Sequence, residues 1–330
     1  MARLQYGDAY FFLKKQLIAA MIGYMALLIF TQIDPRTYRQ WIWPFYFICL
    51  VLLVMVFVPG IGKKAGGASR WIQIGGYSLQ PSDLVKLSLI LVLARIYADR
   101  ESETQIDAKL ILISLGVMIL PVLLIAVEED LGTAIHLVLT CGALLLFTRF
   151  PLKIHAIGFF VFLAGIIYMI KSTPFRLERL KAFLDPWEYR FDSAFQLVAS
   201  MKSFLTGGFW GKGLGEGLRR HNLQERHTDF IVAVVAEDLG ALGVIVLFAA
   251  YFSFAIYGLI ILSKIRDDFT RLVGTGIVIS LIFQVFINAA VAMGLLPTKG
   301  INLPLVSNGG TSLVVYMAMC GIFLSACRRV

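Results

Sequence analysis

Apolar blocks separated by short polar breaks run along the whole chain. The blocks lie at 17–33, 41–58, 83–98, 110–127, 131–148, 154–170, 229–262, 272–293 and 311–327. Each is near the roughly 20 residues with which a helix crosses the hydrocarbon core of a bilayer. Only helices or closed barrels can span lipid, because every backbone polar group there must be satisfied internally. The apolar residues are continuous rather than alternating, so the pattern predicts an all-α bundle of about nine membrane-spanning helices.

The composition excludes a soluble globular protein. Hydrophobic residues make up 58% of the 330 positions and charged residues only 15%, whereas soluble domains carry about a quarter charged residues. The formal net charge of +9 comes from lysines and arginines spread over the loops. Such loops face anionic lipid head groups, so we expect membrane lipid rather than nucleic acid as the charged partner.

Loop charge predicts the orientation of the helices. The short loops at 34–40, 95–109, 149–153, 264–271 and 328–330 hold more lysine and arginine than the short loops opposite. Because positive short loops stay on the cytoplasmic side, the long polar segment at about 171–228 is expected outside.

That outer segment carries helix-start signals. Thr173 and Pro174 suit the N-cap and first position of a helix, and Asp185 to Glu188 repeats the pattern. Leu177, Leu180 and Leu184 form an apolar stripe, which predicts an amphipathic segment lying on the outer interface.

One acidic residue at a membrane border is the leading candidate for chemistry. Asp229 follows Thr228, a suitable N-cap, and is expected in the first turn of a helix that enters the membrane from outside. The helix dipole favours its ionised form while partial burial opposes it, so the carboxylate could act as a general base. An aspartate that only caps the helix is the alternative.

Other acidic residues have simpler interpretations. Asp83 and Lys86 lie three apart on one helical face and can neutralise each other. Glu237, two turns beyond Asp229, is expected to make a polar contact between helices. The three adjacent acids at 128–130 could bind a cation or be solvated. The glycine-rich run at 207–217 lacks the strand and the Lys-Ser/Thr ending of a nucleotide loop, and a flexible outer loop is expected there.

Taken together, these stretches resemble the SEDS family (shape, elongation, division and sporulation) along essentially the whole chain. The matching motifs lie at 67–71, 80–87, 130–134, 183–187, 210–215, 227–231, 294–300 and 303–310. The Pro-Thr-Lys-Gly form at 297–300 and the Asp-Pro-Trp loop at 185–187 favour the FtsW or sporulation branch over RodA. The resemblance implies a single SEDS-like membrane domain over 1–330.

The resemblance also implies a function. Such proteins are peptidoglycan glycosyltransferases of the bacterial cell membrane that polymerise lipid II on the outer face, with a class B penicillin-binding protein and other division proteins as partners. In the family the aspartate of the His-Thr-Asp-Phe motif, here Asp229, is the catalytic carboxylate. Substrate-binding candidates carried over from the motifs are Arg70, Asp83, Lys86, Asp130, Lys212, His227, Lys299 and Ser307. A divalent cation, Mg²⁺ or Mn²⁺, is compatible with this chemistry, its ligands are not predicted, and no organic cofactor is expected.

Several positions depart from the family pattern. Asp83 stands where the family usually has glutamate, Glu128 and Glu129 replace Gln-Pro, and Asn308 replaces a tyrosine. The family usually has ten spans, so the nine seen here are expected to begin just before the second. Two alternatives to the enzyme stay open: a lipid II flippase, which the many spans and buried acids also permit, and a non-catalytic scaffold for division proteins, which the missing first span permits.

Overall fold

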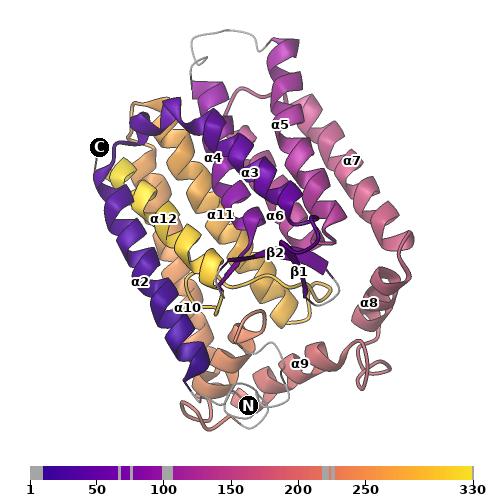
Figure 1. The fold of residues 1–330 in the computed structure, drawn as a ribbon. Helices are drawn as coiled ribbons and strands as arrows, with labels where there is room; N and C mark the ends of the chain where they lie inside the picture. The colour runs from indigo at the N-terminus through magenta and orange to yellow at the C-terminus, as the bar shows by residue number, and fades with distance from the viewer. Residues whose placement is uncertain are drawn as a thin grey trace. The chain divides into compact units, whose positions relative to one another are not determined.

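A computed structural model describes residues 10–65, 68–74, 77–98, 107–217, 223 and 227–328, and most of them are helical. Nine helices coincide with the nine predicted spans. They are α2 (Phe11–Gln32), α3 (Ile42–Met55), α4 (Pro81–Ala98), α5 (Ala108–Val127), α6 (Leu131–Leu146), α7 (Leu152–Lys171), α10 (Ile231–Leu262), α11 (Asp268–Ala292) and α12 (Gly310–Cys327). Figure 1 shows them as long rods.

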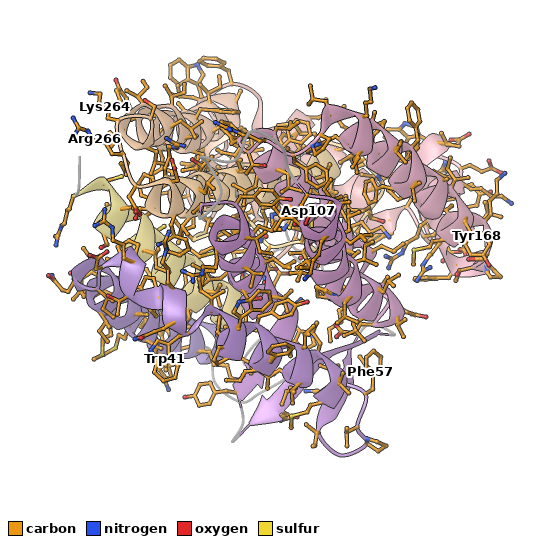
Figure 2. All side chains as sticks on the ribbon, turned by 90° about the horizontal axis from the view of Figure 1, so that it is seen from above. Trp41, Phe57, Asp107, Tyr168, Lys264 and Arg266 are labelled. Carbon is orange, nitrogen blue, oxygen red and sulfur yellow. The ribbon has the colours of Figure 1, made fainter. Side chains whose placement is uncertain are left out.

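Six of these helices are long and apolar enough to cross a membrane by themselves: α2, α5, α7, α10, α11 and α12. Helices α3 and α6 are apolar but shorter, and α4 carries three charged residues, Asp83, Lys86 and Arg95. The chain is therefore a multi-pass membrane protein, as the apolar blocks predict. The loop between α10 and α11 carries Lys264 and Arg266, whose exposed side chains point away from the helices in Figure 2.

The described contacts divide the chain into two compact units, one of residues 1–150, 255–283 and 304–330, the other of 151–254 and 284–303. In the first unit α2 and α12 lie side by side (Figure 1). A Cβ atom at Gly321 would meet the backbone of Leu27, and the Ser325 hydroxyl donates to the Ile33 carbonyl over 2.7 Å. A small residue allows this close helix contact, as is common in membranes.

The first unit also contains a small sheet that the hydropathy pattern does not predict. Strands β1 (Gly62–Ala65), β2 (Ala68–Ile74) and β3 (Tyr77–Leu79) pair antiparallel in the order β1-β2-β3. Ile72 is opposite both Gly62 and Leu79. The sheet brings Arg70 of β2 towards the start of α6, where its guanidinium contacts Asp130.

In the second unit, the outer segment forms two helices. Helix α8 (Pro174–Leu184) begins as predicted, with Thr173 at the N-cap and Pro174 first. The prediction of a second helix start at Asp185 is wrong, because the Asp185 carboxylate accepts the Glu188 amide within a run of turns. Helix α9 begins only at Phe195 and ends at Gly207. The short polar side chain of Asp185 is satisfied by the local turn, which competes with helix formation.

Helix α10 is broken rather than continuous. Gly240 has φ 69° and ψ −170°, a conformation that only glycine adopts without strain. The glycine-rich loop fills the break: the amides of Lys212 and Gly213 donate to the carbonyls of Glu237 and Asp238. In return the amides of residues 241 and 242 donate to the carbonyls of residues 208 and 209. The loop expected to be flexible is thus held by main-chain hydrogen bonds.

Candidate functional site

Asp83 and Lys86 form the buried ion pair that their spacing predicts. Both lie in the first turns of α4, and the Lys86 ammonium is 2.8 Å from the Asp83 carboxylate. Each residue is less than 5% exposed, so neither charge is stabilised by water and each depends on the other. The ammonium also lies 5.6 Å from the centre of the Tyr316 ring on α12, a favourable cation–π geometry.

A chain of buried polar groups continues from this pair into the bundle. Tyr316 hydrogen-bonds the side chain of Ser280 on α11, and the Ser280 carbonyl lies 2.8 Å from Nε2 of His136 on α6. In the sequence His136 stands alone among apolar residues, which indicates a packed side chain. The structure shows it packed, but inside a hydrogen-bonded network that links α4, α6, α11 and α12.

The dependence of Asp83 on Lys86 leads to a first prediction. Lys86→Met should destabilise the protein by about 3–5 kcal/mol, because it leaves a buried carboxylate without its counter-charge. Thermal unfolding in detergent measures the loss as a lower melting temperature. The double variant Asp83→Asn with Lys86→Met should recover most of it, and equal melting temperatures for the single and double variants would contradict the interpretation.

Asp130 is a buried N-cap rather than a solvated acid. Its carboxylate accepts the amide and the hydroxyl of Thr133 in the first turn of α6. Arg70 approaches the same carboxylate to 3.8 Å and donates to the Glu129 carbonyl over 2.8 Å. The Gln80 amide lies 3.4 Å from the other carboxylate oxygen. Arg70, Gln80 and Asp130 are thereby brought together at the starts of α4 and α6.

Glu128 differs from its acidic neighbours, a distinction that the sequence does not reveal. It follows the last residue of α5, is 1% exposed, and neither carboxyl oxygen has a hydrogen-bond partner among the described residues. Glu129 is exposed and adopts φ 63°, which turns the chain between the two buried acids. Burial raises the pKa of Glu128 to about 8; the charge of Asp130 adds to the rise and Arg70 opposes it.

A second prediction concerns pH. The folded state holds the Glu128 proton more tightly than the unfolded chain, so stability should fall as the pH rises from about 5 to about 8, by up to about 4 kcal/mol. Glu128→Gln mimics the neutral form and should flatten this dependence in melting temperatures measured across that range. Glu129→Gln, at the exposed neighbour, should keep the wild-type slope. An unchanged slope in Glu128→Gln would show that the carboxyl is already ionised.

Asp229 belongs to the second unit, and its helix starts later than predicted. Residues 227–230 form a turn, and α10 begins at Ile231, so Asp229 lies just before the first turn rather than within it. Its side chain is half-buried. The Asp229 carbonyl accepts a hydrogen bond of 2.9 Å from the side-chain amide of Asn288 on α11.

Asn288 and Gln284 are functional candidates that sequence reasoning misses. The Asn288 amide donates to the carbonyls of both Asp229 and Ile301, and the Gln284 amide donates to the carbonyl of Asn302. The segment after α11 and the turn containing Asp229 are therefore tied to one helix face. Two amide side chains spaced four apart on an apolar helix lie on one face, and this spacing is the signal that could have found them.

The remaining predicted residues lie at several places. Lys299 is half-buried, two residues before the Ile301 carbonyl that Asn288 holds. Lys212 and His227 are exposed. The main-chain amide of Lys212 donates to the Glu237 carbonyl at the break in α10. Ser307, in the first unit, is buried, and its carbonyl lies 3.4 Å from the Gln16 amide. Glu237 makes the predicted contact between helices, accepting the Ser203 hydroxyl over 3.3 Å.

The residues that the structure describes contain no group of three His, Cys, Asp or Glu side chains arranged to hold a metal ion. Mg²⁺ is often held by only one or two carboxylates together with substrate phosphates. The divalent cation stays a prediction, and no step proposed below depends on it.

Comparisons with known proteins agree with the fold and the motifs. The family model FtsW/RodA/SpoVE, described as cell cycle protein, matches residues 1–330. The chain is 39% identical to the probable peptidoglycan glycosyltransferase FtsW of Geobacter metallireducens, over all of this chain and 88% of that protein. It is 32% identical to the stage V sporulation protein E of Bacillus subtilis, over 99% of this chain and 90% of that protein.

Solved structures show the same fold. A chain from a peptidoglycan synthase complex that coordinates polymerization and crosslinking matches with a TM-score of 0.82 and 25% identity, covering 98% of this chain and 91% of that one. The rod shape determining protein RodA of Thermus thermophilus matches with a TM-score of 0.72 and 25% identity, covering 97% and 88%. The helical bundle, the motifs and the full-length match together place this chain in the FtsW/RodA/SpoVE family.

Proposed function

We propose that this peptidoglycan glycosyltransferase polymerises lipid II at the outer face of the bacterial cell membrane, with Asp229 as its general base. The 4-hydroxyl of the acceptor N-acetylglucosamine attacks C1 of the donor N-acetylmuramic acid. The hydroxyl proton passes to the Asp229 carboxylate as the new glycosidic bond forms. The bond between C1 and the pyrophosphate oxygen breaks, and undecaprenyl pyrophosphate leaves with the electron pair.

The anchoring of Asp229 by Asn288 carries this proposal. One amide holds the main chain of Asp229 and of Ile301, so the turn with the carboxylate is docked beside the segment that contains Lys299. A positioned base contributes about 10²- to 10⁴-fold to such a reaction. A cation such as Lys299 can stabilise the charge that develops on the leaving pyrophosphate.

The partial burial of Asp229 also suits this role. A carboxylate at the border of an apolar helix can reach the sugar of a substrate whose lipid tail remains in the membrane. Ionisable residues at such positions are costly, and their presence is a general indication of function. The partners that we propose are a class B penicillin-binding protein, which would cross-link the glycan strands, and other division proteins.

Reconstitution in liposomes tests the proposal. The purified chain, with its class B penicillin-binding protein, is supplied with fluorescent lipid II, and the products are separated by gel electrophoresis. We expect a ladder of glycan polymer. Lipid II crossing the bilayer without polymer would instead support a flippase, and neither polymer nor crossing from correctly folded protein would support a scaffold.

A further inference from the structure

Four large apolar side chains are exposed at the end of α9 and in the loop that follows. Leu205, Phe209, Trp210 and Leu214 have exposed fractions of 76%, 54%, 77% and 78%; we call them the Trp210 patch. Leaving such a side chain in water forgoes about 1.5–3 kcal/mol of burial free energy. Contiguous exposed apolar residues mark a binding or membrane surface.

The loop that carries the patch is fixed at a defined level of α10. The carbonyl of Phe209 accepts the amide of Leu242, and the amide of Gly213 donates to Asp238. These α10 positions lie 7 to 11 residues after Ile231, on either side of the break at Gly240. Residues 231–236, which precede them, are all apolar. About one and a half apolar turns of α10 therefore separate the start of the helix from the point where the loop is attached.

The loop is bonded to α10 where an exposed apolar stretch of that helix begins. Leu242, bonded to Phe209 through its amide, is 41% exposed, and Ile245 and Val246, one turn further, are 57% and 61% exposed. In a membrane helix such residues face lipid. Because the loop is bonded to the helix at Leu242, its apolar side chains extend the same surface.

The loop backbone is suited to an apolar environment. A loop can lie at membrane depth only where its polar groups are satisfied by protein. The amides of Gly211, Lys212 and Gly213 donate to main-chain carbonyls, and the amide of Gly215 donates to the Asp238 carboxylate over 3.0 Å. Tryptophan is enriched where protein meets the membrane interface, which suits Trp210.

We infer that the Trp210 patch is inserted into the bilayer, so that the glycine-rich loop forms a membrane-embedded wedge beside the break in α10. Its occupant is bilayer lipid. The inference concerns how the chain sits in the membrane and does not depend on the reaction proposed above.

Site-directed spin labelling tests the inference in nanodiscs. Cysteine is introduced singly at Trp210 and Leu214 in a Cys327→Ser background, because the three other cysteines are buried. Val246 serves as the lipid-facing reference and Glu188, exposed in the turns after α8, as the aqueous reference. Collision rates with oxygen, which concentrates in lipid, are compared with those of a water-soluble nickel chelate.

We expect the ratio of oxygen to nickel collisions at positions 210 and 214 to match that at Val246 and to exceed that at Glu188 several-fold. A ratio like that of Glu188 would place the loop in water and overturn the inference, and protection from both reagents would point to a protein surface and overturn it as well. A label-free measurement uses Trp210→Phe: brominated lipid should quench less of the remaining tryptophan fluorescence than in the wild type. Unchanged quenching would also count against lipid contact.

Discussion

Asp229→Asn is expected to lower polymer formation by at least about 100-fold, the contribution of a positioned general base. Asparagine keeps the size of the side chain and its ability to form hydrogen bonds, but it cannot take up the proton of the attacking hydroxyl. The measurement is the amount of glycan polymer formed from fluorescent lipid II by equal amounts of reconstituted protein.

The melting temperature of Asp229→Asn should stay near that of the wild type, since the Asn288 contact is to the main chain and survives the change. Glu178→Gln is the matched control, because it also removes one negative charge in the same unit, from an exposed position on α8. It should polymerise at the wild-type rate. Polymerisation by Asp229→Asn within a few-fold of that rate would remove Asp229 from the role of base.

Gly240→Ala should destabilise the second unit strongly. Its φ of 69° is strained for alanine, and a Cβ atom there would meet the Phe209 carbonyl and the Gly211 amide. The strain of about 1–3 kcal/mol for a residue other than glycine in this backbone region adds to the cost of displacing the loop. We therefore expect a loss of several kcal/mol, in the range that marks a specific backbone defect.

Gly158→Ala is the control for this substitution. Gly158 lies in α7, where an added Cβ atom meets nothing within 4 Å, and alanine favours a helix over glycine by about 1 kcal/mol. Its melting temperature should be unchanged or higher. Hydrogen exchange should become faster at the amides of residues 211–213 in Gly240→Ala alone. Similar melting and exchange in both variants would mean that the loop does not depend on the break.

The helices could be predicted from the sequence because lipid imposes a simple rule on it. A run of apolar residues near the thickness of the bilayer has few alternatives to a helix, and all nine runs are helical. The sheet at 62–79 could not be predicted, because its short strands mix polar residues and glycine and are set by pairing rather than by hydropathy. The break at Gly240 is also hidden, since glycine within a helix costs only about 1 kcal/mol.

The candidate site could be predicted in part. The pairing of Asp83 with Lys86 follows from helical spacing alone. The burial of Asp130 as an N-cap could not be predicted, since the sequence left a bound cation and a solvated acid open. Glu128 could not be separated from Glu129, because the left-handed turn at Glu129 that buries one and exposes the other depends on tertiary packing. Asn288 was missed because its partners are carbonyls of residues distant in the sequence.

The way in which Asn288 and Gln284 hold their partners has a consequence for variation among relatives. Both side-chain amides donate hydrogen bonds to main-chain carbonyl oxygens, which every amino acid carries. Position 302 can consequently change identity over evolutionary time without loosening this attachment, and position 301 can change among apolar residues because Ile301 is buried. The two amides themselves have no equivalent substitute. A survey of natural variants should find more variation at positions 301 and 302 than at Asn288 and Gln284.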